Sequence, residues 1–317
     1  MPQETTPRTL ATKSVAFDRY GSADVLAPRT VELPAPGPGQ VRIAVRTAGV
    51  NPLDHKLRHG SLSDLFHLAL PHVPGIEGAG VVEAVGPDVN ELAVGDEVFG
   101  CTLTGSYAEY ALAEVHRLAR RPPTLGWLEA AAVPSAAETA VRCFTYLGLK
   151  AGETLLLHAA AGGVGTLAVQ LAVARGIRVI GTASESNHAY LRALGAVPVT
   201  YGEDLAERVR AVAPQGVDAA LDGAQRDGSA QVSIELTGGT ERVVAIADQG
   251  DAARHGVYFS GYEDSDFAAA MAETLTLHRA GTLRLPVHRC YPLADAAEAQ
   301  RESERGHLRG KLVLFAR

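Results

Sequence analysis

The sequence predicts an α/β protein with two domains, one rich in β-strands and one containing a doubly wound parallel sheet. Residues 13–120 hold short Val-rich stretches bounded by Gly or Pro, which are typical of a compact sandwich or barrel-like β domain. From about residue 127, apolar runs of four to six residues alternate with helical patterns, as expected for parallel strands buried on both faces. A glycine-rich turn at residues 155–165 joins one such run to a helical pattern.

The β-rich part comes first in the chain. Its strands are expected where Val recurs with alternating spacing, and the Pro-rich segment 33–40 (LPAPGPGQ) is expected to be a stiff surface loop. The expected strands are residues 13–17, 41–50, 80–85, 97–100 and 108–113.

The second part is expected to begin with helices at residues 127–132 and 136–147. After residue 285 the pattern changes again, and a helix at 293–303 and a strand at 311–315 are expected to return to the first domain. The expected parallel strands are residues 154–159, 179–182, 219–222, 243–247 and 256–259.

Composition excludes several classes of protein. A chain of 317 residues with 46% hydrophobic and 21% charged residues is a packed protein rather than a disordered one. The net charge of −7, with basic residues scattered along the chain, predicts no nucleic-acid partner.

Cysteine usage and the N-terminal residues indicate a reducing compartment. Cys101, Cys143 and Cys290 lie far apart and form no C-x-x-C pair, so neither a disulfide framework nor a thiolate metal site is expected. Residues 1–13 contain no apolar h-region of the kind found in a signal peptide, so we expect a cytoplasmic protein.

Residues 154–174 contain no Asp, Glu, Lys or Arg and are numerous enough to span a bilayer. Gly162, Gly163 and Gly165 interrupt the stretch near its middle, which argues against one continuous helix. We therefore expect a buried strand, a turn and a buried helix, and no membrane partner.

The turn carries a dinucleotide-binding pattern. Ala160-x-Gly162-x-x-Gly165 matches the G-x-G-x-x-G fingerprint with Ala for the first Gly. The three small residues permit a tight turn, close approach of the backbone to pyrophosphate, and close packing of helix on strand, while Gly163 and Val164 begin the helix. A purely structural turn is the alternative interpretation.

The predicted cofactor is NADPH. An Asp or Glu about 20 residues after the first small residue would bind the ribose diol of NADH, but residues 181–184 read Gly-Thr-Ala-Ser. Ser184 and Asn187 are expected to donate to a 2′-phosphate instead. Glu185 would favour NADH if it pointed inward.

The chain as a whole resembles the medium-chain dehydrogenase/reductase superfamily, in its zinc-independent quinone oxidoreductase-like branch of enoyl and enone reductases. The resemblance implies a GroES-like catalytic domain made of residues 1–132 and 286–317, a Rossmann NADP-binding domain at 133–285, and a homodimer. It rests on the glycine turn and on 48–54 (AGVNPLD), 74–86 (PGIEGAGVVEAVG), 95–100 (GDEVFG), 105–110 (GSYAEY) and 306–314 (GHLRGKLVL).

Alcohol dehydrogenases of this superfamily bind catalytic zinc through Cys and a Gly-His-Glu segment. The matching positions here are Asn51 and Gly75-Ile76-Glu77, so both soft ligands are missing. His55 and His59 are spaced to present two imidazoles on one helical face, but no third ligand is evident from the sequence. We predict no metal.

The resemblance also implies roles for individual residues. Asn51, His55 and Lys56 become candidates for polarising the substrate carbonyl, although Asn51, Pro52 and Asp54 would also start a helix well. Thr139 is implied beside the nicotinamide ribose, next to Glu138, where the family usually has an apolar residue. Tyr201 and Arg305 are implied near the 2′-phosphate, and the backbone at Phe259 near the carboxamide.

These residues predict an NADPH-dependent oxidoreductase that transfers hydride to a small-molecule enone or quinone. A cofactor-binding relative with a non-redox role, such as a cyclisation or a structural task, is the alternative. Glu138 and the unusual segment 222–231 (DGAQRDGSAQ) motivate that alternative.

Overall fold

The computed structural model describes residues 9–224, 228–261 and 265–316. The chain forms two compact units. The β-rich unit comprises Met1–Ser135, Pro286–His307 and Lys311–Arg317, and the α/β unit comprises Ala136–Leu285 and Leu308–Gly310. Residues 1–8 and 225–227 lie outside the described residues. The structure therefore does not test the expectations about the first residues of the chain and about the middle of the segment 222–231.

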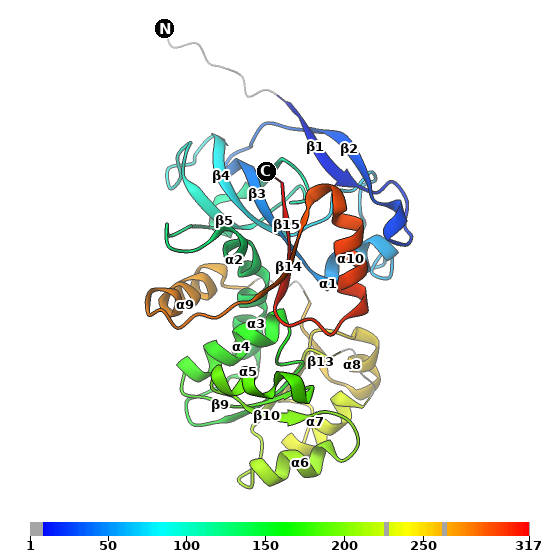
Figure 1. The fold of residues 1–317 in the computed structure, drawn as a ribbon, viewed down its shortest axis with the longest axis vertical. Helices are drawn as coiled ribbons and strands as arrows, with labels where there is room; N and C mark the ends of the chain where they lie inside the picture. Colours follow the sequence, from blue (N-terminus) through cyan, green and yellow to red (C-terminus); the bar gives the residue numbers. More distant parts are fainter. Residues whose placement is uncertain (1–8, 225–227, 262–264, 317) are drawn as a thin grey trace. The chain divides into compact units, whose positions relative to one another are not determined.

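The β-rich unit is built on a seven-stranded sheet with the order β14-β15-β3-β4-β5-β7, and β6 pairs with β3. Figure 1 labels β3, β4, β5, β14 and β15 of this sheet. A separate two-stranded sheet joins β1 to β2. The strands are β1 (Leu10–Ala16), β2 (Ala27–Leu33), β3 (Gln40–Val50), β4 (Glu77–Val85), β5 (Glu97–Cys101), β6 (Tyr110–Glu114), β7 (Leu118–Arg120), β14 (Val287–Pro292) and β15 (Lys311–Phe315).

The helices of this unit are short. α1 (Pro52–His59) follows β3 directly and ends at Gly60, whose φ of 78° is the left-handed conformation common at helix C-termini. The others are η1 (Ala23–Val25), η2 (Val115–Arg117), α2 (Trp127–Ala132), η4 (Leu293–Asp295) and α10 (Ala296–Arg305). α10 packs against α1, so residues from the two ends of the chain meet there.

The last strand completes the sheet of the first domain. β15 pairs antiparallel with β3, and Leu312 lies opposite Val50 (Figure 1). This register places Lys311 beside Asn51 at the point where β3 gives way to α1.

The α/β unit has a six-stranded, entirely parallel sheet in the order β10-β9-β8-β11-β12-β13. Numbered within the unit, this is the 3-2-1-4-5-6 order of a Rossmann fold. The strands are β8 (Thr154–His158), β9 (Arg178–Ala183), β10 (Val197–Thr200), β11 (Ala219–Asp222), β12 (Val243–Ala245) and β13 (Tyr258–Phe259).

Apolar side chains from neighbouring strands form the core of this unit. Leu156, Ile180, Ala220 and Val243 are all fully buried, as expected for strands that lack polar alternation. The helices are α3 (Pro134–Leu147), α4 (Gly163–Ala174), η3 (Glu185–Asn187), α5 (His188–Ala193), α6 (Leu205–Val212), α7 (Ser229–Thr237), α8 (Gln249–His255) and α9 (Phe267–Arg279).

The predicted fold class is confirmed, with local differences. The first strand lies at Leu10–Ala16 rather than 13–17 because it pairs along its whole length with β2, a strand that the sequence analysis did not expect. The expected strand 256–259 is reduced to Tyr258–Phe259, because α8 occupies the residues immediately before Gly256. The expected strand, turn and helix of residues 154–174 are present.

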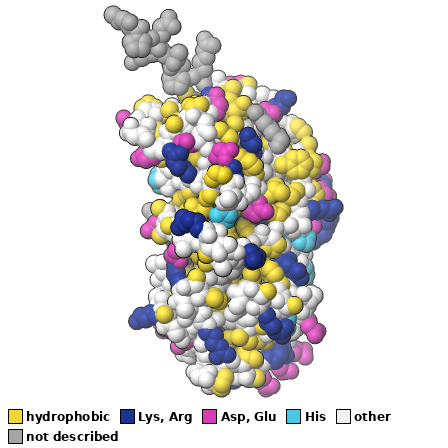
Figure 2. All heavy atoms as spheres, turned by 60° about the vertical axis from the view of Figure 1, so that its left-hand side comes forward, with side chains coloured by type: hydrophobic (Ala, Val, Ile, Leu, Met, Phe, Trp, Pro, Cys, Tyr) yellow, Lys and Arg dark blue, Asp and Glu magenta, His cyan; other side chains and the backbone are white. Residues whose placement is uncertain are grey.

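Within residues 9–224, 228–261 and 265–316, no helix is both long and apolar enough to cross a membrane. Basic and acidic side chains are interspersed on the face drawn in Figure 2.

Candidate functional site

The glycine turn of the α/β unit has the geometry that dinucleotide binding requires. It leaves β8 through Ala159, whose φ is 55°, and enters α4 through Gly162, whose φ is −73° and ψ is −179°. Gly162 is the residue that caps α4, so the first backbone N–H groups of the helix, including those of Gly163 and Val164, have no intrahelical acceptor. Such N–H groups can bind an anion.

The residues of the fingerprint have distinct physical roles. A Cβ at Gly165 would lie 2.4 Å from the Ala159 carbonyl oxygen, so helix and strand approach too closely there for a side chain. Ala160 replaces the usual first Gly, and its Cβ would lie only 2.8 Å from a Cβ placed at Gly181 on β9. Gly181 therefore provides the space for the Ala160 methyl group.

Gly162 has no such internal role. The nearest atom to a Cβ at Gly162 is the Ala159 oxygen at 3.4 Å, which is an ordinary contact. The backbone thus leaves open the position where a pyrophosphate approaches in this fold. These residues fit a nicotinamide dinucleotide.

The end of β9 carries hydroxyl and amide groups instead of an acid. Asn187 Nδ2 donates to Ser184 Oγ at 3.1 Å, and Ser184 Oγ lies 3.0 Å from Ser186 Oγ. Glu185 is exposed. The structure therefore brings together the two predicted polar residues Ser184 and Asn187, while Tyr201 follows the neighbouring strand β10 at the same edge of the sheet.

The basic residue of this cluster, Arg309, was not predicted from the sequence. Arg309 Nε donates to Asn187 Oδ1 at 2.8 Å, and Arg309 Nη2 donates to the Ser186 carbonyl oxygen at 3.3 Å. The predicted Arg305 belongs to the β-rich unit, where its guanidinium lies 3.3 Å from Glu298. The role of Arg305 stays a prediction.

A second cluster lies in the β-rich unit, at the junction of β3 and α1. Lys311 Nζ donates to Glu77 Oε1 at 2.7 Å and to Asn51 Oδ1 at 2.5 Å. Asn51 Nδ2 donates to the same Glu77 oxygen at 2.8 Å, and the Ser135 N–H donates to Glu77 Oε2 at 2.7 Å. Glu77 is fully buried, and the Lys311 side chain is 6% exposed.

The sheet creates the space for this cluster. Gly49 follows Ala48, which pairs with Gly78 in the β3–β4 ladder, and a Cβ at Gly49 would lie 2.4 Å from Glu77 Oε1. The sequence held a signal for the contact, because Lys311 opens an otherwise apolar strand that is buried. A lysine in that position needs an acidic or carbonyl partner.

These residues do not fit a catalytic zinc. Of the three matched ligand positions, Asn51 and Ile76 provide no thiolate or imidazole, and the remaining Glu77 carboxylate is held by the Lys311 ammonium. A divalent cation would be repelled by Lys311.

The candidate Asn51 is both a helix cap and part of this cluster. Its backbone N–H donates to Asp54 Oδ2 at 2.9 Å, and its carbonyl accepts the Asp54 N–H at 3.0 Å. Asp54 also accepts a hydrogen bond from Tyr107 Oη at 2.9 Å. Asp54 is therefore the capping residue that the sequence favoured, while the Asn51 amide contacts Glu77 and Lys311.

Burial perturbs the acid–base groups of this region. Burial raises the pKa of Asp54 to about 6, against the opposing hydrogen bonds from Asn51 and Tyr107. Burial also raises the pKa of Tyr107 well above its usual range, so the phenol stays a donor. For His55, burial lowers the pKa to about 4, so the imidazole is neutral at pH 7.

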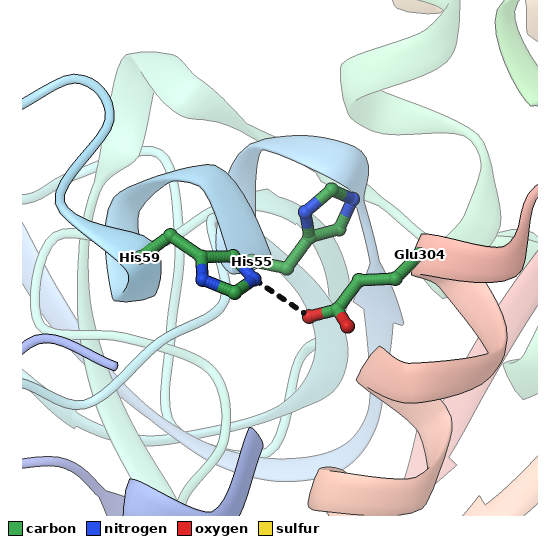
Figure 3. A group of neighbouring side chains, drawn as sticks. All are labelled: His55, His59 and Glu304. Carbon is green, nitrogen blue, oxygen red and sulfur yellow. Dashed lines mark hydrogen bonds and ion pairs between the residues drawn. The ribbon is translucent and has the colours of Figure 1, made fainter. Parts of the chain in front are cut away.

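His55, His59 and Glu304 form the one group of His, Cys, Asp and Glu within the described ranges whose ligand atoms all approach within 4.8 Å (Figure 3). The spacing of the two histidines was evident from the sequence, but the approach of Glu304 was not. His59 Nε2 of α1 lies 3.2 Å from Glu304 Oε1 of α10. Figure 3 marks this contact with a dashed line and shows His55 beside it.

Arg58 makes this group a poor cation site. Its fully buried guanidinium donates to Glu304 and lies 3.2 Å from His59 Nε2. A positive charge of the chain itself therefore stands where a metal ion would bind. We therefore still predict that the protein binds no metal.

The other candidates lie on separate elements. Lys56 and His55 are half-buried on α1 of the β-rich unit, whereas Thr139 is half-buried on α3 of the α/β unit. Glu138, beside Thr139, is buried and accepts a hydrogen bond from Ser265. Phe259 ends β13, which pairs with β12.

Comparisons with known proteins agree with this fold. Residues 37–123 match the alcohol dehydrogenase GroES-like domain, and residues 194–314 match the zinc-binding dehydrogenase domain. The chain is 32% identical over 327 residues to the quinone oxidoreductase of Lama guanicoe, which covers 96% of this chain and 97% of that protein.

Other relatives extend the comparison. The chain is 37% identical over 313 residues to the pikromycin polyketide synthase component PikAII of Streptomyces venezuelae; this covers 93% of the chain but only 8% of that much longer protein. A mycobacterial structure in complex with NADPH superposes with a TM-score of 0.83 and 29% identity, covering 96% of this chain and 100% of that one.

The fold and the glycine turn define a protein of the medium-chain dehydrogenase/reductase superfamily. The chain belongs to the quinone oxidoreductase-like branch of this superfamily.

The two glycines of the turn should respond differently to an added methyl group. We expect Gly165→Ala to lower the free energy of unfolding by about 1–3 kcal/mol, because its Cβ would overlap the Ala159 carbonyl. Gly162→Ala should fold normally but weaken the binding of a nicotinamide dinucleotide by at least about tenfold, because the methyl group occupies the open position. Urea unfolding and a fluorescence titration measure the two effects, and wild-type dinucleotide affinity in Gly162→Ala would contradict this assignment.

Lys311→Met should lower the free energy of unfolding by about 3–5 kcal/mol, because it leaves the Glu77 charge buried without its partner. The double variant Lys311→Met/Glu77→Gln should recover most of that loss. Arg210→Met, which breaks an exposed pair with Glu235, is the control and should change stability by less than about 1 kcal/mol. If Lys311→Met lowered the free energy of unfolding by no more than Arg210→Met, the buried pair would not have the stabilising role that we expect.

Asp54 should make the protein less stable as the pH rises from about 4 to 6. Its pKa in the folded state is about 6 against 3.8 for the free side chain, so the folded protein holds a proton that the unfolded chain releases. At about 1.4 kcal/mol per pKa unit the whole shift corresponds to about 3 kcal/mol, so the difference in unfolding free energy between wild type and Asp54→Asn should fall by about 2 kcal/mol between pH 4 and 6. Urea unfolding at several pH values tests this, with exposed Asp64→Asn as control; parallel profiles for wild type and Asp54→Asn would refute it.

Proposed function

We propose that the protein is a zinc-independent, NADPH-dependent oxidoreductase that reduces a quinone or the C=C bond of an α,β-unsaturated carbonyl. The observation that carries the proposal is the Lys311–Glu77–Asn51 cluster at the positions where zinc-dependent relatives have ligands. A simple ketone or alcohol reacts through an alkoxide on a single oxygen, which zinc stabilises in those relatives. A conjugated acceptor spreads the negative charge, so hydrogen-bond donors are sufficient.

The cofactor part of the proposal rests on the turn and on the end of β9. Gly162 leaves the pyrophosphate position open, and Ser184 stands where NADH enzymes carry an acid. The NADPH complex of the mycobacterial relative supports the same choice. When bound, NADPH supplies a hydride to the β-carbon of an enone or to a quinone.

The chain's own groups would then stabilise the negative oxygen and supply the proton. Neutral His55 is a weak proton donor at pH 7 because burial lowers its pKa to about 4. The Asn51 amide already contacts Glu77 and Lys311. We therefore assign the role of hydrogen-bond donor to the negative oxygen to Lys56, which lies half-buried on the same helix, and solvent supplies the one proton that completes the reduction.

Purified protein, a panel of enones and quinones, and NADPH or NADH test the proposed reaction. The proposal expects oxidation of NADPH with at least one member of the panel, and higher kcat/KM with NADPH than with NADH. Tight NADPH binding without turnover would contradict it and favour a non-redox role.

Lys56→Met should lower kcat/KM for the enone or quinone by about 10²–10³, because the developing negative oxygen loses its donor. The Kd for NADPH should stay within about twofold, and Lys56→Arg should restore part of the activity. Lys150→Met removes an exposed lysine and serves as the control. Full activity in Lys56→Met would refute the assignment.

A further inference from the structure

A short segment near the end of the chain lies against the glycine turn. Leu308–Gly310 belongs to the α/β unit although the residues on both sides belong to the β-rich unit. Gly310 N–H donates to the Ala161 carbonyl at 3.0 Å, and Gly310 forms a parallel bridge with Gly162. The backbone is thus held beside the turn, and Arg309 projects from an anchored position.

The guanidinium of Arg309 is oriented by three groups of the same unit. Its Nε donates to Asn187 Oδ1 at 2.8 Å, and its Nη2 donates to the Ser186 carbonyl at 3.3 Å. The guanidinium carbon lies 5.2 Å from the ring centroid of Tyr190. Tyr190 Oη in turn lies 3.1 Å from Thr166 Oγ1 of α4, so the ring is itself held in place.

The groups around Arg309 are uncharged hydrogen-bonding groups. Asn187 Nδ2 donates to Ser184 Oγ, which follows directly after β9. Among the residues that the structure describes, Arg309 makes no contact with a carboxylate, whereas Arg305 lies 3.3 Å from Glu298. Arg309 is exposed, so its positive charge is accessible to a ligand.

We propose that Arg309, with Ser184 and Asn187, binds the 2′-phosphate of the adenosine ribose and is the residue that selects NADPH over NADH. This inference rests on the proposed function and adds to it a specificity residue that lies outside the parallel-sheet segment of the sequence. A phosphate at the end of β9 meets a planar guanidinium that can form two parallel hydrogen bonds, and two neutral donors beside it. The ribose diol of NADH is uncharged, so the positive charge of Arg309 would not strengthen its binding.

Binding of 2′,5′-ADP and 5′-AMP to the full-length chain tests the proposal by calorimetry, because the two ligands differ only in the 2′-phosphate. We expect Arg309→Ala to weaken 2′,5′-ADP binding by about 10–100-fold, the effect of losing hydrogen bonds from a charged group. Binding of 5′-AMP should change by less than about twofold. Arg309→Lys should retain part of the preference, since it keeps the charge but loses the planar fork.

Arg279→Ala removes an exposed arginine from α9 of the same unit and should leave the affinity for both ligands unchanged. Equal weakening of both ligands in Arg309→Ala would overturn the proposal by showing a structural role. Loss of the preference in Arg305→Ala but not in Arg309→Ala would also overturn it. If Arg305 rather than Arg309 provided the preference, NADPH-dependent turnover would persist and the proposed function would stand. Failure of the wild type to bind either NADPH or NADH would overturn both the role of Arg309 and the proposed function.

Discussion

The buried pair between Lys311 and Glu77 is the contact on which the β-rich unit depends. Glu77 begins β4 and Lys311 begins β15, so the pair joins the first third of the chain to its last strand. Without Lys311, the fully buried Glu77 carboxylate would keep hydrogen bonds from Asn51 and Ser135 but no compensating charge. Gly49 makes room for the carboxylate, and the register of β15 on β3 brings the ammonium to it.

The same pair determines what chemistry the unit can support. An ammonium bound to Glu77 and Asn51 occupies the region where zinc-dependent relatives have their ligands, so in the proposed reaction charge on a substrate oxygen would be stabilised by hydrogen bonds. Asp54 and Tyr107 continue the cluster and hold the start of α1 in place. The start of α1, the helix that carries Lys56, is thus held in place by hydrogen bonds between protein groups.

Local patterns in the sequence predicted a large part of this structure. The apolar run, the small residues and the helical spacing around Gly162 all lie within 21 consecutive residues, 154–174, and they predicted β8, the turn and α4 correctly. The position of Ser184 and Asn187 after β9 could be predicted because their distance from the turn is set by the Rossmann fold, and their role in binding stays a prediction.

Contacts between distant residues could not be predicted in this way. β2 was missed because it is stabilised by pairing with β1 rather than by its own pattern. Lys311 and Glu77 are 234 positions apart, and their pairing follows from the strand register of the folded sheet. Arg309 was overlooked for the same reason, since Asn187 is 122 positions away in the sequence.

In the proposed reaction this chain directs hydride from NADPH to a conjugated acceptor without zinc. Mass spectrometry of the product formed from NADPH that carries deuterium at both C4 positions, in the presence of a zinc chelator, measures this directly. We expect one deuterium at the β-carbon of the reduced enone and an unchanged rate with the chelator. Loss of turnover on chelation that is restored by Zn²⁺, or a product without deuterium at that carbon, would contradict it.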